Sequence, residues 1–132
     1  MSKVLIIEDE PMLRKLLERV VQMVGLEPVS VSTGAEGLAL ASSDNPSLII
    51  TDLCLPTPPS NAELVMALRQ ARPDCPIVVT TGYSIGNLDT RLRALGAVYF
   101  LEKPFDLFTA RSLIAAALPD SAARSSSSPS SS

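Results

Sequence analysis

The feature that most constrains this chain is the alternation of short apolar runs with helical patterns along its length. The runs occupy residues 4–7, 48–50, 77–79 and 98–101. At 29–32 valines alternate with serines, which predicts a half-exposed edge strand. Between them, apolar residues recur three and four positions apart, as they do in amphipathic helices. Strands that alternate with helices in this way predict right-handed crossovers and a parallel sheet, and therefore an α/β fold.

Local signals predict where several helices begin. Pro11 suits the first turn of a helix over 11–24, and Asp106 suits the cap of a last helix that ends near residue 118. A further helix is expected over about 87–95. Two more helices begin at capping boxes, in which a hydroxyl residue precedes a glutamate by three positions. These boxes are Thr33 with Glu36 and Ser60 with Glu63.

Length and composition are typical of one domain with an aliphatic core. The chain has 132 residues, of which 46% are hydrophobic and 4% aromatic. We expect the domain to occupy residues 1–119, and the serine-rich tail at 120–132 to be disordered because it has no apolar pattern. The formal net charge is −3 and the eleven basic residues are scattered, so we expect no direct binding to nucleic acid.

The residues that the chain lacks exclude several kinds of site. Histidine is absent, which excludes HExxH zinc sites, Ser-His-Asp catalysis and a phosphohistidine. Cys54 and Cys75 form no CxxC pair, and we interpret them as reduced thiols of a cytoplasmic protein. No run of about 18 apolar residues is present, so we expect no membrane span.

Polar residues follow the apolar runs at positions that suit a shared site. In chain order they are Glu8 and Asp9, Asp52, Thr81, and Lys103. If the runs are parallel strands, these residues lie at the carboxyl ends, where open α/β sheets place their ligand crevices. The sequence therefore predicts a carboxylate pocket that also holds one lysine and one hydroxyl.

Each of these residues alone has an ordinary structural explanation. Acidic residues at 8–10 are typical of a turn before a helix, where the helix dipole favours negative charge. Asp52 alone suits a turn, and Lys103 alone suits a solvated surface. Thr80 and Thr81 compete for one role, because strand alternation points only one of them into the crevice.

Four segments in order carry a resemblance to a known family. They are Ile7-Glu8-Asp9-Glu10, Thr51-Asp52-Leu53-Cys54-Leu55-Pro56, Val79-Thr80-Thr81-Gly82 and Leu101-Glu102-Lys103-Pro104-Phe105. Over residues 3–118 or so the chain resembles the receiver domain of bacterial two-component response regulators. The resemblance implies a three-layer, doubly wound, flavodoxin-like fold with five parallel strands in the order 2-1-3-4-5. It also implies a phosphoacceptor domain rather than an enzyme.

The resemblance implies a magnesium site at the acidic residues. An aspartate that attacks a phosphoryl group is an anion approaching an anion, so a divalent cation must bridge the two. Mg²⁺, or Mn²⁺ in its place, prefers such oxygen ligands. By resemblance, Asp9 and Asp52 provide carboxylate ligands, the Cys54 backbone carbonyl is the third ligand, and Glu8 holds a metal-bound water.

The resemblance also assigns the transfer and switch residues. Asp52 is the phosphoacceptor, Lys103 neutralises a phosphoryl oxygen, and the Thr81 hydroxyl donates to another. Spacing to Lys103 in the family pattern selects Thr81 over Thr80. Phe100, three positions before Lys103, matches a switch aromatic, although an ordinary strand aromatic would look the same.

The implied partners are a sensor histidine kinase or a phosphotransfer protein, together with an unknown downstream protein. The face formed by residues 87–117 is a candidate for a phosphorylation-dependent dimer. The alternative is that the chain is a receiver domain cut from a hybrid histidine kinase or from a multidomain regulator. A flavodoxin-type ligand-binding module would share the fold, but acidic residues at 8–10 would repel its phosphate. The loop at 56–59 is rich in proline and one residue longer than the family pattern, which leaves its effect open.

Overall fold

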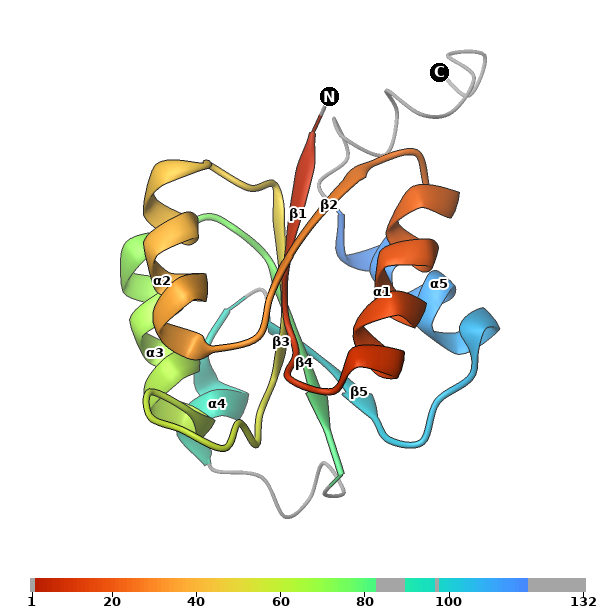
Figure 1. The fold of residues 1–132 in the computed structure, drawn as a ribbon. Helices are drawn as coiled ribbons and strands as arrows, with labels where there is room; N and C mark the ends of the chain where they lie inside the picture. The colour runs from red at the N-terminus through yellow and green to blue at the C-terminus, as the bar shows by residue number, and fades with distance from the viewer. Residues whose placement is uncertain (1, 83–89, 97, 119–132) are drawn as a thin grey trace.

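Five parallel strands form one sheet, and helices cover both of its faces (Figure 1). The structure is a computed structural model that describes residues 2–82, 90–96 and 98–118. Its elements in chain order are β1 (Lys3–Ile7), α1 (Pro11–Met23), β2 (Glu27–Val31), α2 (Gly34–Ser43), β3 (Leu48–Asp52), α3 (Asn61–Ala71), β4 (Ile77–Thr81), α4 (Thr90–Ala94), β5 (Val98–Glu102) and α5 (Leu107–Ala117). The strand order is β2-β1-β3-β4-β5, which confirms the predicted fold class.

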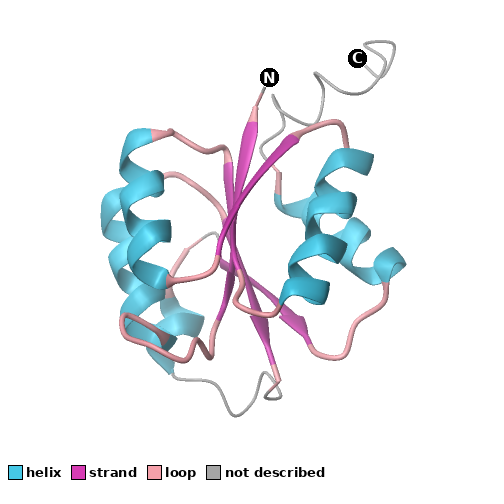
Figure 2. Ribbon diagram, viewed as in Figure 1, coloured by secondary structure: helices cyan, strands magenta, loops and turns pink. Residues whose placement is uncertain are grey.

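The sheet separates two hydrophobic cores and so produces three layers (Figure 2). One core lies under α2, α3 and α4, and the other lies under α1 and α5 (Figure 1). The central strands β3 and β4 are buried at every position, as expected of continuous apolar runs covered on both faces. β2 is only partly buried and lies at the edge, which confirms the prediction made from its alternating valines and serines.

Helix ends follow most of the local signals. Pro11 is the first residue of α1, the Thr33 hydroxyl accepts a hydrogen bond from the Glu36 backbone N–H, and the Asp106 carboxylate accepts one from the Thr109 N–H at 2.7 Å. Leu118 is the C-cap of α5. The region predicted as a helix over 87–95 is described only from residue 90, where α4 begins, and the tail at 120–132 lies outside the described residues.

The capping box predicted at Ser60 and Glu63 is wrong. Ser60 is the N-cap of α3, but its side chain makes no capping hydrogen bond. Asn61 adopts a left-handed conformation with φ of 56°, and its N–H donates instead to the Leu53 carbonyl at 2.8 Å. The Ser60 hydroxyl is then used by the Asn61 side chain, which donates to it at 3.2 Å. The Ser60 hydroxyl therefore accepts from the Asn61 side chain and not from a backbone N–H of α3.

The proline-rich loop between β3 and α3 contacts the start of α2. A Cβ placed on Gly34 would lie 2.2 Å from the Pro59 carbonyl oxygen, so only glycine fits between loop and helix. Three residues later, a Cβ on Gly37 would lie 2.2 Å from the Ile7 side chain of β1. The two glycines let α2 approach both the loop and the sheet closely.

Among the described residues, no helix is long and apolar enough to cross a membrane.

Candidate functional site

Three carboxylates meet at the carboxyl edge of the sheet, which is the lower edge in Figure 1. One carboxylate oxygen from each of Glu8, Asp9 and Asp52 lies within 4.8 Å of the others. Glu8 and Asp9 follow β1, and Asp52 ends β3, its neighbour in the sheet. Glu8 and Asp52 are buried, whereas Asp9 is exposed. The structure thus brings these three acidic residues together at one edge of the sheet.

Lys103 extends into the acidic cluster from the loop after β5. Its ammonium lies 3.2 Å from Asp52 Oδ1 and 3.7 Å from Glu8 Oε1. The backbone places it there, because the Lys103 N–H donates to the Thr81 carbonyl at 2.7 Å. The Lys103 ammonium therefore contacts two buried carboxylates of the cluster at once.

Glu8 is a buried carboxyl group whose pKa is raised by its surroundings. Its side chain is 1% exposed, and burial, followed by the negative charge of Asp52, raises its pKa from 4.5 to about 7. The hydrogen bond from the Glu10 N–H and the charge of Lys103 oppose this shift. Within the described part of the chain, Glu8 Oε1 has no hydrogen-bond partner. An orphaned buried carboxylate oxygen is the kind of atom that a cation or its bound water satisfies.

Arg14 fixes the acidic loop from α1. Its guanidinium donates to the backbone carbonyl of Glu8 at 2.9 Å, while the Glu10 N–H donates to Glu8 Oε2 at 3.2 Å. Sequence analysis did not identify Arg14. A basic residue in the second turn of the helix after an acidic loop is the available signal, but only the path of the chain shows that it bonds to Glu8.

The two threonines at the end of β4 lie on opposite faces of the sheet. Ile77 and Val79 belong to the core under α3 and α4, whereas Val78 belongs to the core under α1 and α5. Strand alternation then puts Thr80 on the α1 and α5 face and Thr81 on the other. Both are fully buried.

The same alternation sorts the other site residues. Glu8, Asp52 and Lys103 continue the strand positions that face α1 and α5, so Thr80 shares their face. Phe100 shares the face of Thr81: it is half-buried and contacts the core that contains Leu92 of α4. Thr81, the last residue of β4, therefore lies on the same face as the predicted switch aromatic.

Cys54 borders Asp52 on the solvent side. Its N–H donates to Asp52 Oδ1 at 3.2 Å, and its side chain is an exposed free thiol. The turn after β3 therefore holds the Asp52 carboxylate through the backbone.

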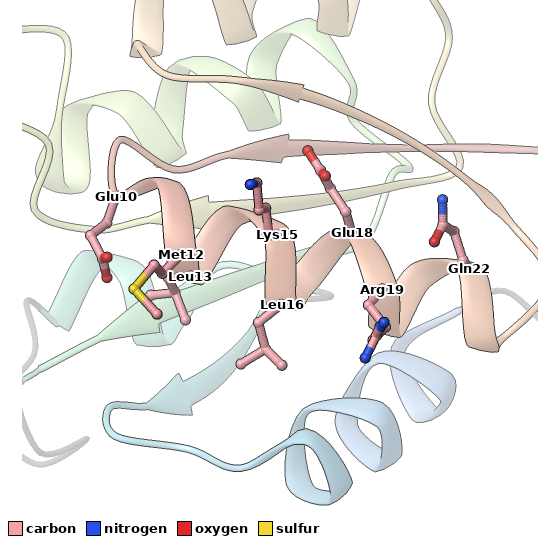
Figure 3. Close-up of a pocket in the computed structure, with 8 residues that line it drawn as sticks. All are labelled: Glu10, Met12, Leu13, Lys15, Leu16, Glu18, Arg19 and Gln22. Atoms are coloured by element: carbon pink, nitrogen blue, oxygen red, sulfur yellow. The ribbon is translucent and has the colours of Figure 1, made fainter.

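A shallow groove runs along α1 beside the site and shares Glu10 with the acidic loop (Figure 3). Apolar and charged side chains both line it, and Leu16 leaves the helix on the side opposite to Lys15 and Glu18 (Figure 3). Met12, at its beginning, is 79% exposed. The groove is an open helix face rather than an enclosed ligand cavity.

Solved structures similar to this one include a response regulator and a receiver domain. Chemotaxis response regulator CheY4 of Vibrio cholerae superimposes with a TM-score of 0.80 at 28% identity, covering 89% of this chain and 99% of CheY4. The receiver domain of nitrogen regulatory protein C (NtrC) gives a TM-score of 0.76 at 28% identity, covering 88% of this chain and 93% of that domain.

Sequence relatives extend the likeness to longer regulators. Response regulator protein PilR of Pseudomonas aeruginosa is 39% identical over 119 residues, which cover 89% of this chain but 26% of PilR. RegA of Rhodovulum sulfidophilum, a photosynthetic apparatus regulatory protein, is 38% identical over 107 residues, or 80% of this chain and 56% of RegA. The family model that describes the response regulator receiver domain matches residues 4–115. With the acidic edge and its lysine in place on the expected fold, this chain belongs to the response regulator receiver domain family.

Proposed function

We propose that this chain is a phosphoacceptor switch that takes a phosphoryl group from a sensor histidine kinase or a phosphotransfer protein onto Asp52. The observation that carries the proposal is the contact of Lys103 with Asp52 at 3.2 Å inside a cluster of three carboxylates. Asp52 is the only one of the three at the end of the middle strand, between β1, which leads into Glu8 and Asp9, and β4, which ends at Thr81. The acidic cluster also argues against a flavodoxin-type phosphate site, since uncompensated carboxylates repel phosphate.

The donor set fits Mg²⁺ or Mn²⁺. All side-chain donors are carboxylate oxygens, the ligands that hard cations prefer, and Glu8 Oε1 is buried without a hydrogen-bond partner among the described residues. Asp9 and Asp52 would hold the cation directly, with the Cys54 backbone carbonyl as third ligand and Glu8 acting through a water. When bound, the cation offsets the repulsion between the carboxylates and the incoming phosphoryl group.

The chain's own residues divide the remaining work. The Asp52 carboxylate is the nucleophile, and the Cys54 N–H holds it in place. Lys103 moves from Asp52 to a phosphoryl oxygen and neutralises it. Thr81 donates its hydroxyl to a second phosphoryl oxygen, which draws it away from the core that contains Phe100. Phe100 then turns inward and changes the surface formed by α4, β5 and α5, where downstream proteins or a second copy would bind.

Protein partners have room to approach the site. α1 and α5 begin at the same edge of the sheet as the acidic cluster (Figure 1), and Met12 and Phe108 near these starts are each 79% exposed. We propose that the kinase or phosphotransfer protein contacts these apolar side chains while its phosphohistidine reaches Asp52. The two free cysteines suit a cytoplasmic location for this exchange.

A separate domain or protein would carry out the response that this receiver regulates. NtrC of Escherichia coli, 31% identical over 86% of this chain, is a DNA-binding transcriptional regulator of which this chain covers 24%. We infer that this chain acts as the regulated module of such a system, either alone or as a piece of a longer protein, and not as its DNA-binding part.

Incubation with acetyl phosphate and Mg²⁺, followed by intact mass measurement, tests the proposal. Wild-type protein should gain one phosphoryl group, and Asp52→Asn should gain none. Asp9→Asn is the second informative variant, because it leaves the acceptor in place and removes a ligand. A phosphoadduct of undiminished yield in Asp52→Asn would refute the assignment of the acceptor.

A further inference from the structure

Thr80 presents a buried hydroxyl with nothing to bond. Its side chain is fully buried, and Oγ1 has no hydrogen-bond partner within the described part of the chain. A buried polar group that lacks a partner destabilises the fold, because it has lost its hydrogen bonds to water and gained none in return. Valine has nearly the same shape, suits a buried strand, and would avoid this cost. The hydroxyl therefore destabilises the resting fold, which indicates a use in another state.

The sheet places this hydroxyl beside Asp52. Thr80 is the register partner of Asp52 across the β3–β4 pair, and the two strands are joined there by the hydrogen bond from the Leu53 N–H to the Thr80 carbonyl at 2.9 Å. Side chains at paired positions on one face of a sheet are neighbours, and both residues face α1 and α5. Asp52 is the polar group nearest to Thr80 along this register.

The partners of Asp52 change during the proposed transfer. In the structure, Asp52 Oδ1 accepts from the Cys54 N–H and contacts the Lys103 ammonium, each at 3.2 Å. In the proposed function Lys103 shifts to the phosphoryl group, so the carboxylate loses one of these two partners as it becomes the nucleophile. A rotation of the Thr80 side chain about χ1 would supply a new donor without any backbone movement.

We propose that Thr80 is a positioning residue whose hydroxyl donates to the Asp52 carboxylate once Lys103 has left it. The bond restrains the carboxylate while one of its oxygens forms a bond to phosphorus. With acetyl phosphate as donor, the bond between phosphorus and the acetyl oxygen breaks and acetate leaves with the electron pair. This inference rests on the proposed function, but it assigns Thr80 a task distinct from that of Thr81, which lies on the opposite face.

Two measurements on Thr80→Val and Thr80→Ser test the inference. The first is the melting temperature in EDTA, where Thr80→Val should melt about 3 °C above wild type because it removes the unpaired hydroxyl. The second is the phosphorylation rate with acetyl phosphate at saturating Mg²⁺, which should fall about tenfold in Thr80→Val, as expected for loss of a hydrogen bond to a charged group. Thr80→Ser keeps the hydroxyl and should retain most of the rate.

Thr51→Val is the matched control. It also removes a fully buried hydroxyl at this edge, but Thr51 faces the other core, and its hydroxyl is already used by the Asp52 backbone carbonyl at 3.1 Å. We expect no gain in melting temperature and an unchanged rate. A residue that only supports the fold would lower stability and rate together, whereas Thr80→Val should raise one and lower the other.

Each contrary outcome has a definite meaning. A wild-type rate in Thr80→Val, or a Thr80→Ser rate as low as that of Thr80→Val, would overturn the inference. Failure of Thr80→Val to fold would also overturn it, since the hydroxyl would then have a structural partner. Absence of phosphorylation in wild type would instead refute the proposed function.

Discussion

Replacement of Glu8 by glutamine should stabilise the protein at neutral pH in EDTA, and added Mg²⁺ should reduce this advantage over wild type. Burial and the charge of Asp52 raise the pKa of Glu8 from 4.5 to about 7. Between these two pH values the folded protein therefore holds a proton that the unfolded chain has released. Glutamine has a similar shape to protonated glutamic acid and cannot ionise. The variant therefore keeps the neutral form at every pH.

The raised pKa fixes the sign and size of the effect. Below pH 4.5 both states of wild type are protonated at Glu8, and its full contribution to stability is present. Between pH 4.5 and about 7 the unfolded chain ionises first, so the free energy of unfolding falls as pH rises. At about 1.4 kcal/mol per pH unit, this gap corresponds to about 3 kcal/mol at pH 8. Glu8→Gln should not show this fall in the free energy of unfolding, because glutamine does not ionise.

Urea unfolding followed by circular dichroism, in EDTA at several pH values between 4 and 8, measures the difference. The two proteins should be similar near pH 4, and the variant should become more stable by about 3 kcal/mol as pH approaches 8. Glu10→Gln, which removes an exposed carboxylate from the same loop, controls for the change in net charge.

Mg²⁺ should shift this balance toward wild type. A cation stabilises the ionised cluster, so wild type should gain more stability than Glu8→Gln on titration with Mg²⁺ at pH 8. A stability difference that does not vary with pH in EDTA, or one in which wild type gains on the variant as pH rises, would refute the account of Glu8 as a buried carboxylate raised by desolvation.

Three further outcomes follow from the geometry. Gly34→Ala should destabilise the fold, because its Cβ would lie 2.2 Å from the Pro59 carbonyl oxygen. This clash costs about 1–3 kcal/mol, which exceeds the gain in helix propensity of at most about 1 kcal/mol, and urea unfolding measures the net loss. Asp9→Ala should lose most of its affinity for Mn²⁺, since one of two direct carboxylate ligands is gone; equal affinity in a Mn²⁺ titration would contradict the ligand set. Beryllofluoride with Mg²⁺ should change amide exchange mainly in residues 81–110 and leave the helix over 11–24 nearly unchanged; a uniform change would mean that the switch does not run through β4 and β5.

Much of the fold could be predicted because its signals are local. The aliphatic runs, the exposed alternation of β2 and the caps at Thr33 and Asp106 all act within a few residues, and the structure has them where the sequence places them. The missing capping bond at Ser60 could not be predicted, since the Ser60 hydroxyl accepts instead from the Asn61 side chain, whose residue takes a left-handed conformation. Burial of the site residues likewise depends on which elements cover them.

The sequence by itself determined which residues reach the functional edge, because each polar residue ends a strand and parallel strands end together. Only the tertiary structure decided their chemical states. Glu8 acquires its raised pKa from burial beside Asp52, and Arg14 reaches the Glu8 carbonyl through the turn into α1. Thr80 and Thr81 are adjacent and chemically identical in sequence, yet the pleat of β4 sends them to opposite faces. The physical reason is that the order of strands and helices follows from neighbouring residues along the chain. Burial, charge pairing and the face on which a side chain lies depend instead on residues that are distant in sequence and meet only in the folded sheet.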